Sequence, residues 1–264
     1  MVVTSLDECS LEQPEIKSAV RESVTVLLPT YCEAGNIENL IREIQELDLN
    51  LAITVIDDSS PDGTPEIVKR LQEEYGNIQL VSRKGKLGLG TAITAGLRLL
   101  LNREESPDYI ITMDADYSHN PQDIPRLVLA AEKGNDLVIG SRYIPGGETK
   151  DWPLKRKLIS RAANLAANFI IGRKMQDCTS GFRCYSKRYV KTVISSLHSQ
   201  TFEIQIETIR QAFLNGFKVK QIPISFAERK KGQSKMKTAE MQGFIVYVIK
   251  RSFGRLSVNF GRKS

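Results

Sequence analysis

Residues 24–58 read VTVLLPTYCEAGNIENLIREIQELDLNLAITVIDD. Two short runs rich in β-branched and aliphatic residues, 24–31 and 52–58, flank a segment whose apolar residues recur at helical spacing. These apolar positions are Ile37, Leu40, Ile41, Ile44 and Leu47. We therefore expect a strand, a helix that begins after Gly35 and lays one face on a sheet, and a second strand.

The same alternation continues along the chain. Further strands are expected at 78–82, 108–116 and 136–142, and helices at 64–75, 87–102, 121–133 and 153–171. This order gives five βα units and predicts an α/β fold with a Rossmann-like, mostly parallel central sheet flanked by helices. Beyond it we expect a strand near 182–185, helices around 187–197 and 202–215, and a strand at 219–226 whose pairing the pattern leaves open.

Composition limits the possible partners. The chain has 264 residues, a net charge of +6 and a pI near 9.1, which favours anionic partners without choosing among them. Four cysteines without a CxxC pair and only two histidines argue against a zinc site and favour reduced thiols. The acidic N-terminus does not resemble a signal peptide, and the longest uncharged stretches are too short to span a bilayer.

Acidic side chains end three of the predicted strands. They are Glu33 after the first strand, Asp57 and Asp58 after the second, and Asp114 and Asp116 after the fourth. Ligands of open α/β sheets bind outside the carboxyl ends of the strands, so these carboxylates are expected to line one crevice. For Asp58 we expect a nucleotide contact, whereas residues 59–63 have the composition of a turn and a helix start.

The triplet DAD at 114–116 is the best metal candidate. A turn or a helix cap would explain a lone DxD. At the end of an apolar strand, beside a second aspartate pair, Asp114 and Asp116 favour a hard cation such as Mg²⁺ or Mn²⁺ whose other ligands are phosphate oxygens.

Other motifs are less specific. The run GKLGLGTA at 85–92 suits either a phosphate cradle or a closely packed helix start, and no GxGxxG follows the first strand, which disfavours a dehydrogenase. Arg142 is expected to face the crevice, whereas Lys155 and Lys157 fit a solvated surface. For the two histidines a surface or core position is preferred over catalysis, and Trp152 suits either a stacking platform or the core.

Several motifs in one order resemble a known family. They are PTYCEAGNI, IDDSSPDGT, GLGTA, MDADYSHNP, GSRY, WPLKRKLISR, SGFRCY and RKKGQSK. Over about residues 24–255 the chain resembles family 2 glycosyltransferases of GT-A fold, and among them the dolichol-phosphate (polyprenyl-phosphate) mannose synthases. The first four motifs are shared with other transferases of that superfamily.

The resemblance implies a set of site residues. Nucleotide-sugar contacts would come from Pro29, Tyr31, Glu33, Ile56, Asp58, Asp114, Ala115, Asp116, Arg229 and Lys235, the last two in a mobile basic loop at 228–237. The acceptor phosphate would meet Arg142, Arg156 and Ser160, and catalysis would rest on Asp116, Arg142 and Arg156. Asp116 would be the principal metal ligand with Asp114 beside it, and Ser118 replaces a glutamine of other members, which puts a second side-chain ligand in doubt.

The implied reaction is metal-dependent, inverting transfer of mannose from GDP-mannose to dolichyl (polyprenyl) phosphate. The rivals are a polyprenyl-phosphate glucose synthase or related transferase, and a non-catalytic nucleotide-sugar-binding subunit of a membrane complex. Residues 1–22 are expected to be a tail, 23–237 the catalytic domain, and 238–264 an amphipathic segment for which core packing is the alternative to membrane or partner contact. We expect a peripheral protein on the cytoplasmic side of a membrane, held there directly or through small membrane subunits, and no nucleic-acid partner.

Overall fold

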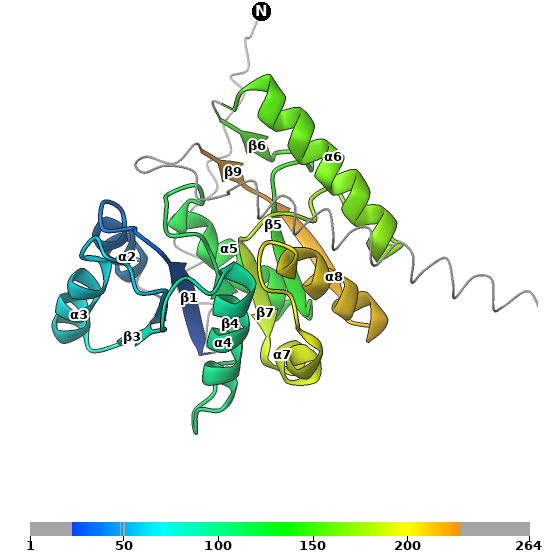
Figure 1. Cartoon of the computed structure of the whole chain (residues 1–264). Coiled ribbons are helices and arrows are strands. Elements are labelled where there is room, and N and C mark those ends of the chain that lie inside the picture. The colour runs from blue at the N-terminus through cyan, green and yellow to red at the C-terminus, as the bar shows by residue number, and fades with distance from the viewer. Residues whose placement is uncertain (1–22, 48, 50, 151, 228–264) are drawn as a thin grey trace, which may run out of the picture.

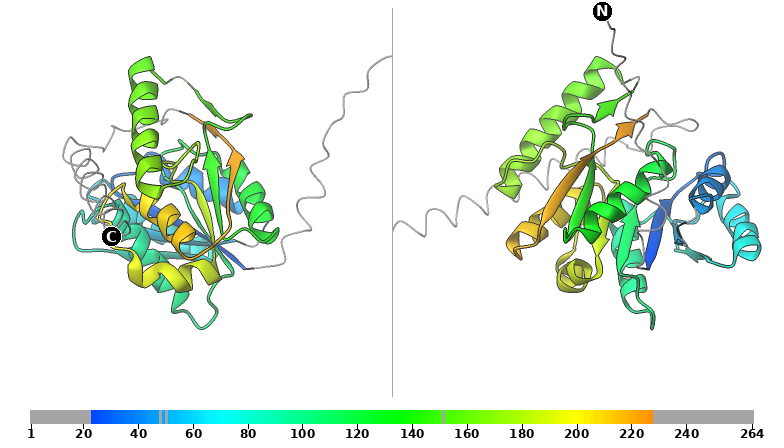
Figure 2. Two further views of the ribbon diagram at one scale, coloured as in Figure 1. Left: turned by 90° about the vertical axis from the view of Figure 1, so that its right-hand side faces the viewer. Right: turned by 180° about the vertical axis from the view of Figure 1, so that it is seen from behind.

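A seven-stranded sheet forms the centre of the chain. The computed structural model describes residues 23–47, 49, 51–150 and 152–227. The sheet order is β3-β2-β1-β4-β7-β5-β8, and helices cover both of its faces (Figures 1 and 2). The strands are β1 (Val24–Thr30), β2 (Ala52–Asp57), β3 (Ile78–Ser82), β4 (Tyr109–Thr112), β5 (Leu137–Ser141), β7 (Arg183–Ser186) and β8 (Val219–Pro223).

The helices divide between two hydrophobic cores. On one face α2 (Ile37–Gln45), α3 (Thr64–Tyr75) and α5 (Ile124–Glu132) pack on the sheet, and on the other lie α4 (Leu89–Leu101), α6 (Leu154–Ile171), α7 (Lys187–Val193) and α8 (Ile204–Leu214). Short 3₁₀ turns, η1 (Pro121–Asp123) and η2 (Ile194–Ser196), precede α5 and follow α7. All five apolar positions of the opening helical pattern are buried, as the spacing predicts.

Parallel pairing joins all neighbouring strands except β7. Strands β1, β2, β3 and β4 pair in parallel, as do β5 and β8, whereas β7 runs antiparallel to both β4 and β5. The predicted mostly parallel sheet is therefore confirmed. Its fourth and fifth strands are not neighbours, however, because β7 lies between them.

The predicted strand at 219–226 is wrong as a single element. The chain forms β8 up to Pro223 and then β9 (Ser225–Phe226), which pairs in parallel with β6 (Glu148–Thr149) in a separate two-stranded sheet. Pro223 has no amide proton to continue a ladder, and the Ile224 amide instead donates to the Ser141 carbonyl. This break transfers the chain from the main sheet to the small one.

The predicted fourth strand is also too long. β4 ends at Thr112, so the DAD triplet lies in a loop after the strand and not on it. Beyond β6, α6 lies beside the small sheet and extends past the end of the central sheet (Figures 1 and 2). Within the described residues, no helix is long and apolar enough to cross a membrane.

Candidate active site

Three loops at the carboxyl ends of neighbouring strands contain strained backbone. Cys32 after β1, Ser59 after β2 and Tyr117 after β4 have φ values of 57°, 55° and 63°. They are the non-glycine residues with positive φ in the described chain. Such conformations cost about 1–3 kcal/mol each and cluster at functional sites. The backbone therefore marks the same sheet edge that the acidic side chains predict.

The first two of these loops hold each other in place. The Cys32 amide donates to the Ser60 hydroxyl at 2.8 Å, and the Glu33 amide donates to the Thr64 hydroxyl at 2.9 Å. Asp62 accepts from the Ala34 amide at 3.0 Å and from the Thr64 hydroxyl. Residues 59–63 thus form the expected turn and helix start. The hydrogen bonds between the two loops hold this wall of the crevice in place.

The Asp58 carboxylate is held by the loop that follows β3. Arg83 Nε donates to Asp58 Oδ1 at 2.6 Å, and both side chains are largely buried. The amides of Leu87 and Gly88 donate to Oδ2 at 2.9 and 3.3 Å. A ligand group meeting Asp58 would therefore meet a carboxylate that is already oriented.

Gly88 and Gly90, in the run at 85–92, allow the backbone to pack closely against a neighbouring loop. A Cβ on Gly88 would lie 2.5 Å from the Gln200 carbonyl oxygen, and one on Gly90 would collide with the Ser199 carbonyl oxygen. The Gly90 amide also donates to the Gln200 carbonyl at 2.9 Å. Of the two readings left open for GLGTA, close packing of the helix start is the one that the structure shows.

The DAD loop presents one half-exposed and one buried carboxylate. Asp114 has 36% of its side chain exposed, whereas Asp116 is 6% exposed and its Oδ1 accepts from the Ser118 amide at 3.0 Å. Among the described residues, no three His, Cys, Asp or Glu side chains converge as a complete metal site. Two carboxylates fit a hard cation that takes its remaining ligands from water and a diphosphate.

His119 is a buried structural residue and not a base. It is fully buried between Phe182 and Phe226, with ring centroids 5.1 Å away in each case, and its Nδ1 accepts from the Asp114 amide at 3.2 Å. Burial lowers its pKa to about 4, with the Arg142 charge acting in the same direction and the aspartates opposing. It is therefore neutral near pH 7, as the preferred core position implies.

Arg142 is fixed by a residue that the sequence pattern did not reveal. Its Nε and one terminal nitrogen donate to the two oxygens of Asp177 at 2.8 and 2.7 Å, and its amide donates to Oδ2 at 3.0 Å. Thr179 accepts a further bond at 2.6 Å. Burial lowers the pKa of Arg142, but the charge of Asp177 outweighs this effect and raises it.

An aromatic cluster joins this arginine to α6. The Trp152 ring lies 4.1 Å from the Arg156 guanidinium carbon and 5.4 Å from that of Arg142. Phe226 packs edge-on against Trp152 at 5.3 Å and also contacts Arg142 and His119. Trp152, with 7% of its surface exposed, is therefore both a core anchor and a stacking platform for cations.

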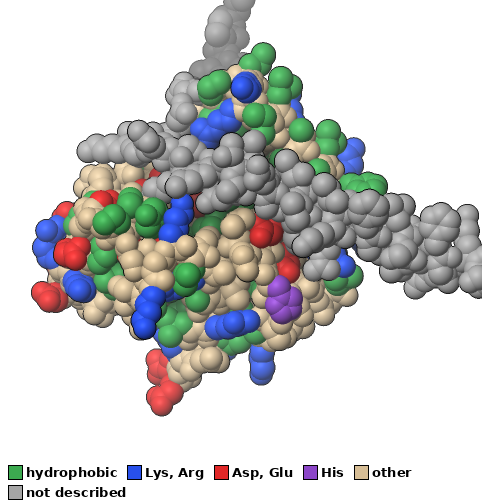
Figure 3. Space-filling view, in the orientation of Figure 1, with side chains coloured by type: hydrophobic (Ala, Val, Ile, Leu, Met, Phe, Trp, Pro, Cys, Tyr) green, Lys and Arg blue, Asp and Glu red, His purple; other side chains and the backbone are tan. Residues whose placement is uncertain are grey.

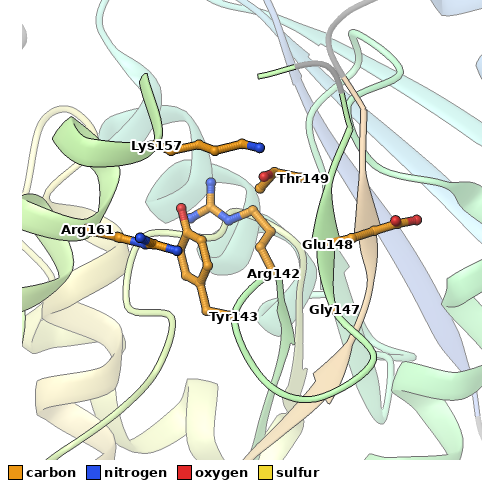
Figure 4. Close-up of a pocket in the computed structure, with 7 residues that line it drawn as sticks. All are labelled: Arg142, Tyr143, Gly147, Glu148, Thr149, Lys157 and Arg161. Atoms are coloured by element: carbon orange, nitrogen blue, oxygen red, sulfur yellow. The ribbon is translucent and has the colours of Figure 1, made fainter. Parts of the chain in front are cut away.

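A pocket of about 310 Å³ opens beside Arg142. Lys157 and Arg161 reach it from α6, and in Figure 4 the Lys157 amine and Thr149 lie toward the Arg142 guanidinium while the Glu148 carboxylate points away. The complete lining is Arg142, Tyr143, Gly147, Glu148, Thr149, Lys157 and Arg161. Arg142 is already paired with Asp177, so the surplus positive charge comes from Lys157 and Arg161, and with the one acid pointing outward the lining suits an anion.

The predicted acceptor residues surround this pocket in different ways. Arg142 lines it directly, Ser160 accepts a hydrogen bond from the lining Tyr143 hydroxyl at 2.8 Å, and Arg156 stacks on Trp152. Lys157, which the sequence suggested is solvated surface, lines the pocket instead. The signal that could have placed it is its spacing of four residues from Arg161, which puts both on one helix face.

The predicted nucleotide residues lie on and around the first two strands. Pro29 is the one partly exposed residue of β1, Tyr31 lies under the Lys86 amine at 5.0 Å, and Glu33 accepts from the Asn36 side chain at 3.0 Å. Ile56 and Ala115 are 1% and 3% exposed, so both predicted contact residues are buried in this structure. Arg229, Lys235, the loop 228–237, the tail 1–22 and the segment 238–264 lie outside the described residues.

The sequence matches one protein family and is similar to two named bacterial proteins. Residues 25–194 match the family described as glycosyl transferase family 2. A polyprenol monophosphomannose synthase of Mycolicibacterium smegmatis is 37% identical over 213 residues, which are 80% of each chain. An undecaprenyl-phosphate mannosyltransferase of Micrococcus luteus is 36% identical over 215 residues, which are 81% of this chain and 87% of that protein.

Solved structures show the same fold. Glucosyl-3-phosphoglycerate synthase from Mycobacterium tuberculosis, in complex with Mn²⁺, UDP-glucose and phosphoglyceric acid, gives a TM-score of 0.68 at 20% identity and covers 93% of this chain and 86% of its own. The same enzyme with Mg²⁺ and UDP gives 0.65 at 20% identity, with 90% and 82% covered. At this identity the likeness shows the GT-A arrangement of sheet and helices.

Proposed function

The chain belongs to glycosyl transferase family 2, and from that membership we propose that it transfers mannose from GDP-mannose to a polyprenyl phosphate such as dolichyl phosphate. The observation that carries the proposal is the pocket in which Arg142, Lys157 and Arg161 meet beside the aspartate crevice. A phosphate head group suits those cations, which donate charge-assisted hydrogen bonds. The names of the two bacterial relatives, both mannosyl transferases acting on lipid phosphates, support the same acceptor class.

The donor would bind in the crevice formed by the loops after β1, β2 and β4. Tyr31, Glu33 and Asp58 would contact the guanine nucleotide, and Asp114 and Asp116 would hold Mg²⁺ or Mn²⁺ against its diphosphate. When bound, the cation would neutralise charge on the diphosphate leaving group. Structural neighbours that carry Mn²⁺ or Mg²⁺ with UDP support this use of a divalent metal. The role expected for Arg229 and Lys235, closing over the donor, remains a prediction.

The proposed chemistry is one inverting displacement at the sugar C1. An oxygen of the acceptor phosphate forms a bond to C1 while the bond from C1 to the diphosphate oxygen breaks, and GDP leaves with the electron pair. The acceptor phosphate is already anionic near neutral pH, so no general base has to remove a proton. The neutral, buried His119 agrees with such a site, whose chain residues position and stabilise charge.

The testing experiment follows labelled mannose from GDP-mannose to a short-chain, water-soluble polyprenyl phosphate with Mg²⁺ or Mn²⁺. Wild type is compared with the double variant Lys157→Ala/Arg161→Ala. Loss of the hydrogen bonds from both side chains should raise the KM for the acceptor about 100-fold or more and leave the KM for GDP-mannose nearly unchanged, because each hydrogen bond to a charged group contributes about 1.5–3 kcal/mol. Lys155→Ala is the matched control, since this exposed lysine of α6 does not line the pocket.

Three results would count against the proposal. Transfer from UDP-glucose but not from GDP-mannose would identify a polyprenyl-phosphate glucose synthase. Metal-dependent binding of GDP-mannose without turnover on any polyprenyl phosphate would favour the non-catalytic subunit. An unchanged acceptor KM in the double variant would remove the pocket from the mechanism.

A peripheral position at the cytoplasmic side of a membrane is part of the same proposal. The acceptor's hydrocarbon chain must stay in a bilayer while its phosphate enters the pocket. Attachment through small membrane subunits and attachment by the chain itself are both compatible with this requirement. Fractionation of cells that express the chain alone separates them, because only direct attachment keeps the protein on membranes in that case.

A further inference from the structure

Exposed large apolar residues concentrate on one helix. In α6, Leu154, Leu158 and Leu165 are 77%, 60% and 72% exposed, and Ile159 is 47% exposed. Elsewhere in the described chain, outside α6, Leu87 and Leu214 are the large apolar side chains with comparable exposure. A helix of a globular domain normally turns such residues inward, so this face is suited to a partner.

The exposed leucines form a single stripe. At about 100° per residue, Leu154, Leu158 and Leu165 fall within roughly 40° of each other around the helix axis. We call these three residues the apolar stripe. The buried face of the same helix, with Asn164, Ala167 and Ile170, lies on the opposite side and packs toward the second core. The apolar stripe is therefore directed away from the body of the protein.

The charges around the apolar stripe have one sign. Between residues 154 and 174 there is no Asp or Glu, and the cations are Lys155, Arg156, Lys157, Arg161, Arg173 and Lys174. Figure 3 shows hydrophobic and Lys or Arg side chains mixed over the region of α6 on the visible face. An apolar stripe flanked by cations alone is complementary to an anionic lipid surface, whereas a second copy of the same helix would present like charges and be repelled.

The anion pocket lies along one edge of the apolar stripe. Lys157 and Arg161 line the pocket and flank the stripe on the same side, and the nearer residue, Arg161, is about 20° from Leu154 around the helix axis. A lipid whose phosphate occupies the pocket would thus have its hydrocarbon chain start beside the leucines. This link rests on the function proposed above, whereas the stripe and its charges do not.

We propose that α6 docks this protein on an anionic phospholipid bilayer, with the apolar stripe inserted among the acyl chains and the flanking cations at the head groups. In this orientation the pocket opens at the lipid surface, where a membrane-embedded acceptor presents its phosphate. Each cation near an anionic surface contributes about fivefold to binding, and each buried leucine about tenfold or more. Direct docking by α6 requires no transmembrane helix.

The first experiment measures binding of the full chain to vesicles by co-sedimentation. Vesicles of phosphatidylglycerol mixed with phosphatidylcholine are compared with phosphatidylcholine alone. Wild type should sediment with the anionic vesicles, and Leu158→Glu/Leu165→Glu should reduce its partition coefficient at least tenfold. Leu214→Glu is the matched control, because Leu214 on α8 is also an exposed leucine, at 62%, but lies outside the stripe.

Two outcomes would overturn the proposal. Binding of the double variant equal to wild type would mean that another part of the chain makes the membrane contact. A wild-type dimer in solution that the same double variant dissociates, without vesicle binding, would show that the stripe joins two copies of the chain. Unfolding curves of both variants should match wild type, since the substituted side chains are exposed.

A second experiment separates this inference from the proposed function. Transfer to a polyprenyl phosphate embedded in anionic vesicles should fall at least tenfold in Leu158→Glu/Leu165→Glu, while transfer to a water-soluble short-chain acceptor stays at the wild-type rate. Equal loss on both acceptors would refute a docking role. If wild type transfers to neither acceptor, the proposed function fails, and co-sedimentation still decides whether α6 binds the bilayer.

Discussion

The Asp177 carboxylate accepts three hydrogen bonds from Arg142, one from its amide and two from its guanidinium. Both side chains are almost completely buried, and Asp177 also accepts from the amides of Thr179 and Ser180. The carboxylate thus fixes the end of β5 and the direction of the guanidinium at once. The main cation of the pocket is oriented before any ligand enters, which is how preorganised sites stabilise charge.

Replacing this carboxylate should destabilise the protein strongly. Asp177→Asn leaves a buried guanidinium without its counter-charge, and breaking a buried pair in this way costs about 3–5 kcal/mol of unfolding free energy. Denaturant unfolding measures the change. Glu148→Gln is the control, because its pair with Lys150 is exposed to solvent and should contribute little to stability. Equal losses in the two variants would show that burial of the pair does not matter.

The same pair predicts a pH dependence of stability. Burial alone would raise the pKa of Asp177, but the charge and hydrogen bonds of Arg142 outweigh it and hold that pKa below its ordinary value of 3.8. A depressed carboxyl pKa stabilises the fold above the unfolded-state value, and this contribution is lost as the pH falls through the folded-state value. The difference in unfolding free energy between wild type and Asp177→Asn should therefore be constant above about pH 5 and shrink below about pH 4. A difference that grows on acidification would contradict the assignment.

Replacing Trp152 should weaken the binding of the acceptor and not that of the donor. Its ring lies against Arg156 and Arg142, and cation–π contacts of this kind contribute about 0.5–2 kcal/mol each. Trp152→Leu is expected to raise the KM for polyprenyl phosphate about 3- to 30-fold with little change in the KM for GDP-mannose. Trp152→Phe retains an aromatic face and should recover most of the loss. Failure of phenylalanine to rescue would point to packing volume as the role of the ring.

Binding of the divalent metal should depend on the carboxylates of the DAD loop. Asp116→Asn removes a charged ligand of the proposed cation, so Mn²⁺ binding in the presence of GDP, measured by calorimetry, should weaken at least 100-fold. Asp108→Asn is a matched control, because Asp108 lies just before the opposite end of β4 and bonds to Ser23. Undiminished Mn²⁺ binding in Asp116→Asn would place the metal elsewhere or remove it from the proposal.

The elements that could be predicted from sequence are those with strong periodicity. The bounds of α3 and β3 agree residue for residue with the expected ranges, because apolar spacing and flanking glycines define them locally. The gathering of acidic loops at one sheet edge followed from the rule for parallel strands. Arg142 was expected at that edge for the same reason, and the structure places it beside the Asp114 loop.

Features that depend on distant partners could not be predicted. The antiparallel insertion of β7 between β4 and β5 is decided by pairing across more than 40 residues, and the sequence pattern of a four-residue strand contains no direction. Asp177 belongs to a turn-like segment, and no neighbouring residue in the sequence indicates that its partner is Arg142, 35 positions earlier. The break at Pro223 could have been predicted from the sequence, since proline has no amide to donate. The second sheet, in which the chain continues after the break, could not.

The position of β7 also affects how the chain is made. At the ribosome, β1 to β4 can pair as soon as residue 112 emerges, but β4 has its other neighbour only after β7, which begins at Arg183. Translation at about 5–20 residues per second leaves that edge open for roughly 4–14 s. An uncapped strand of four buried, apolar or β-branched residues is a template for pairing with other nascent chains. Slow synthesis, or stalling between these two strands, should therefore favour aggregation, and chaperones that shield nascent chains should raise the soluble yield.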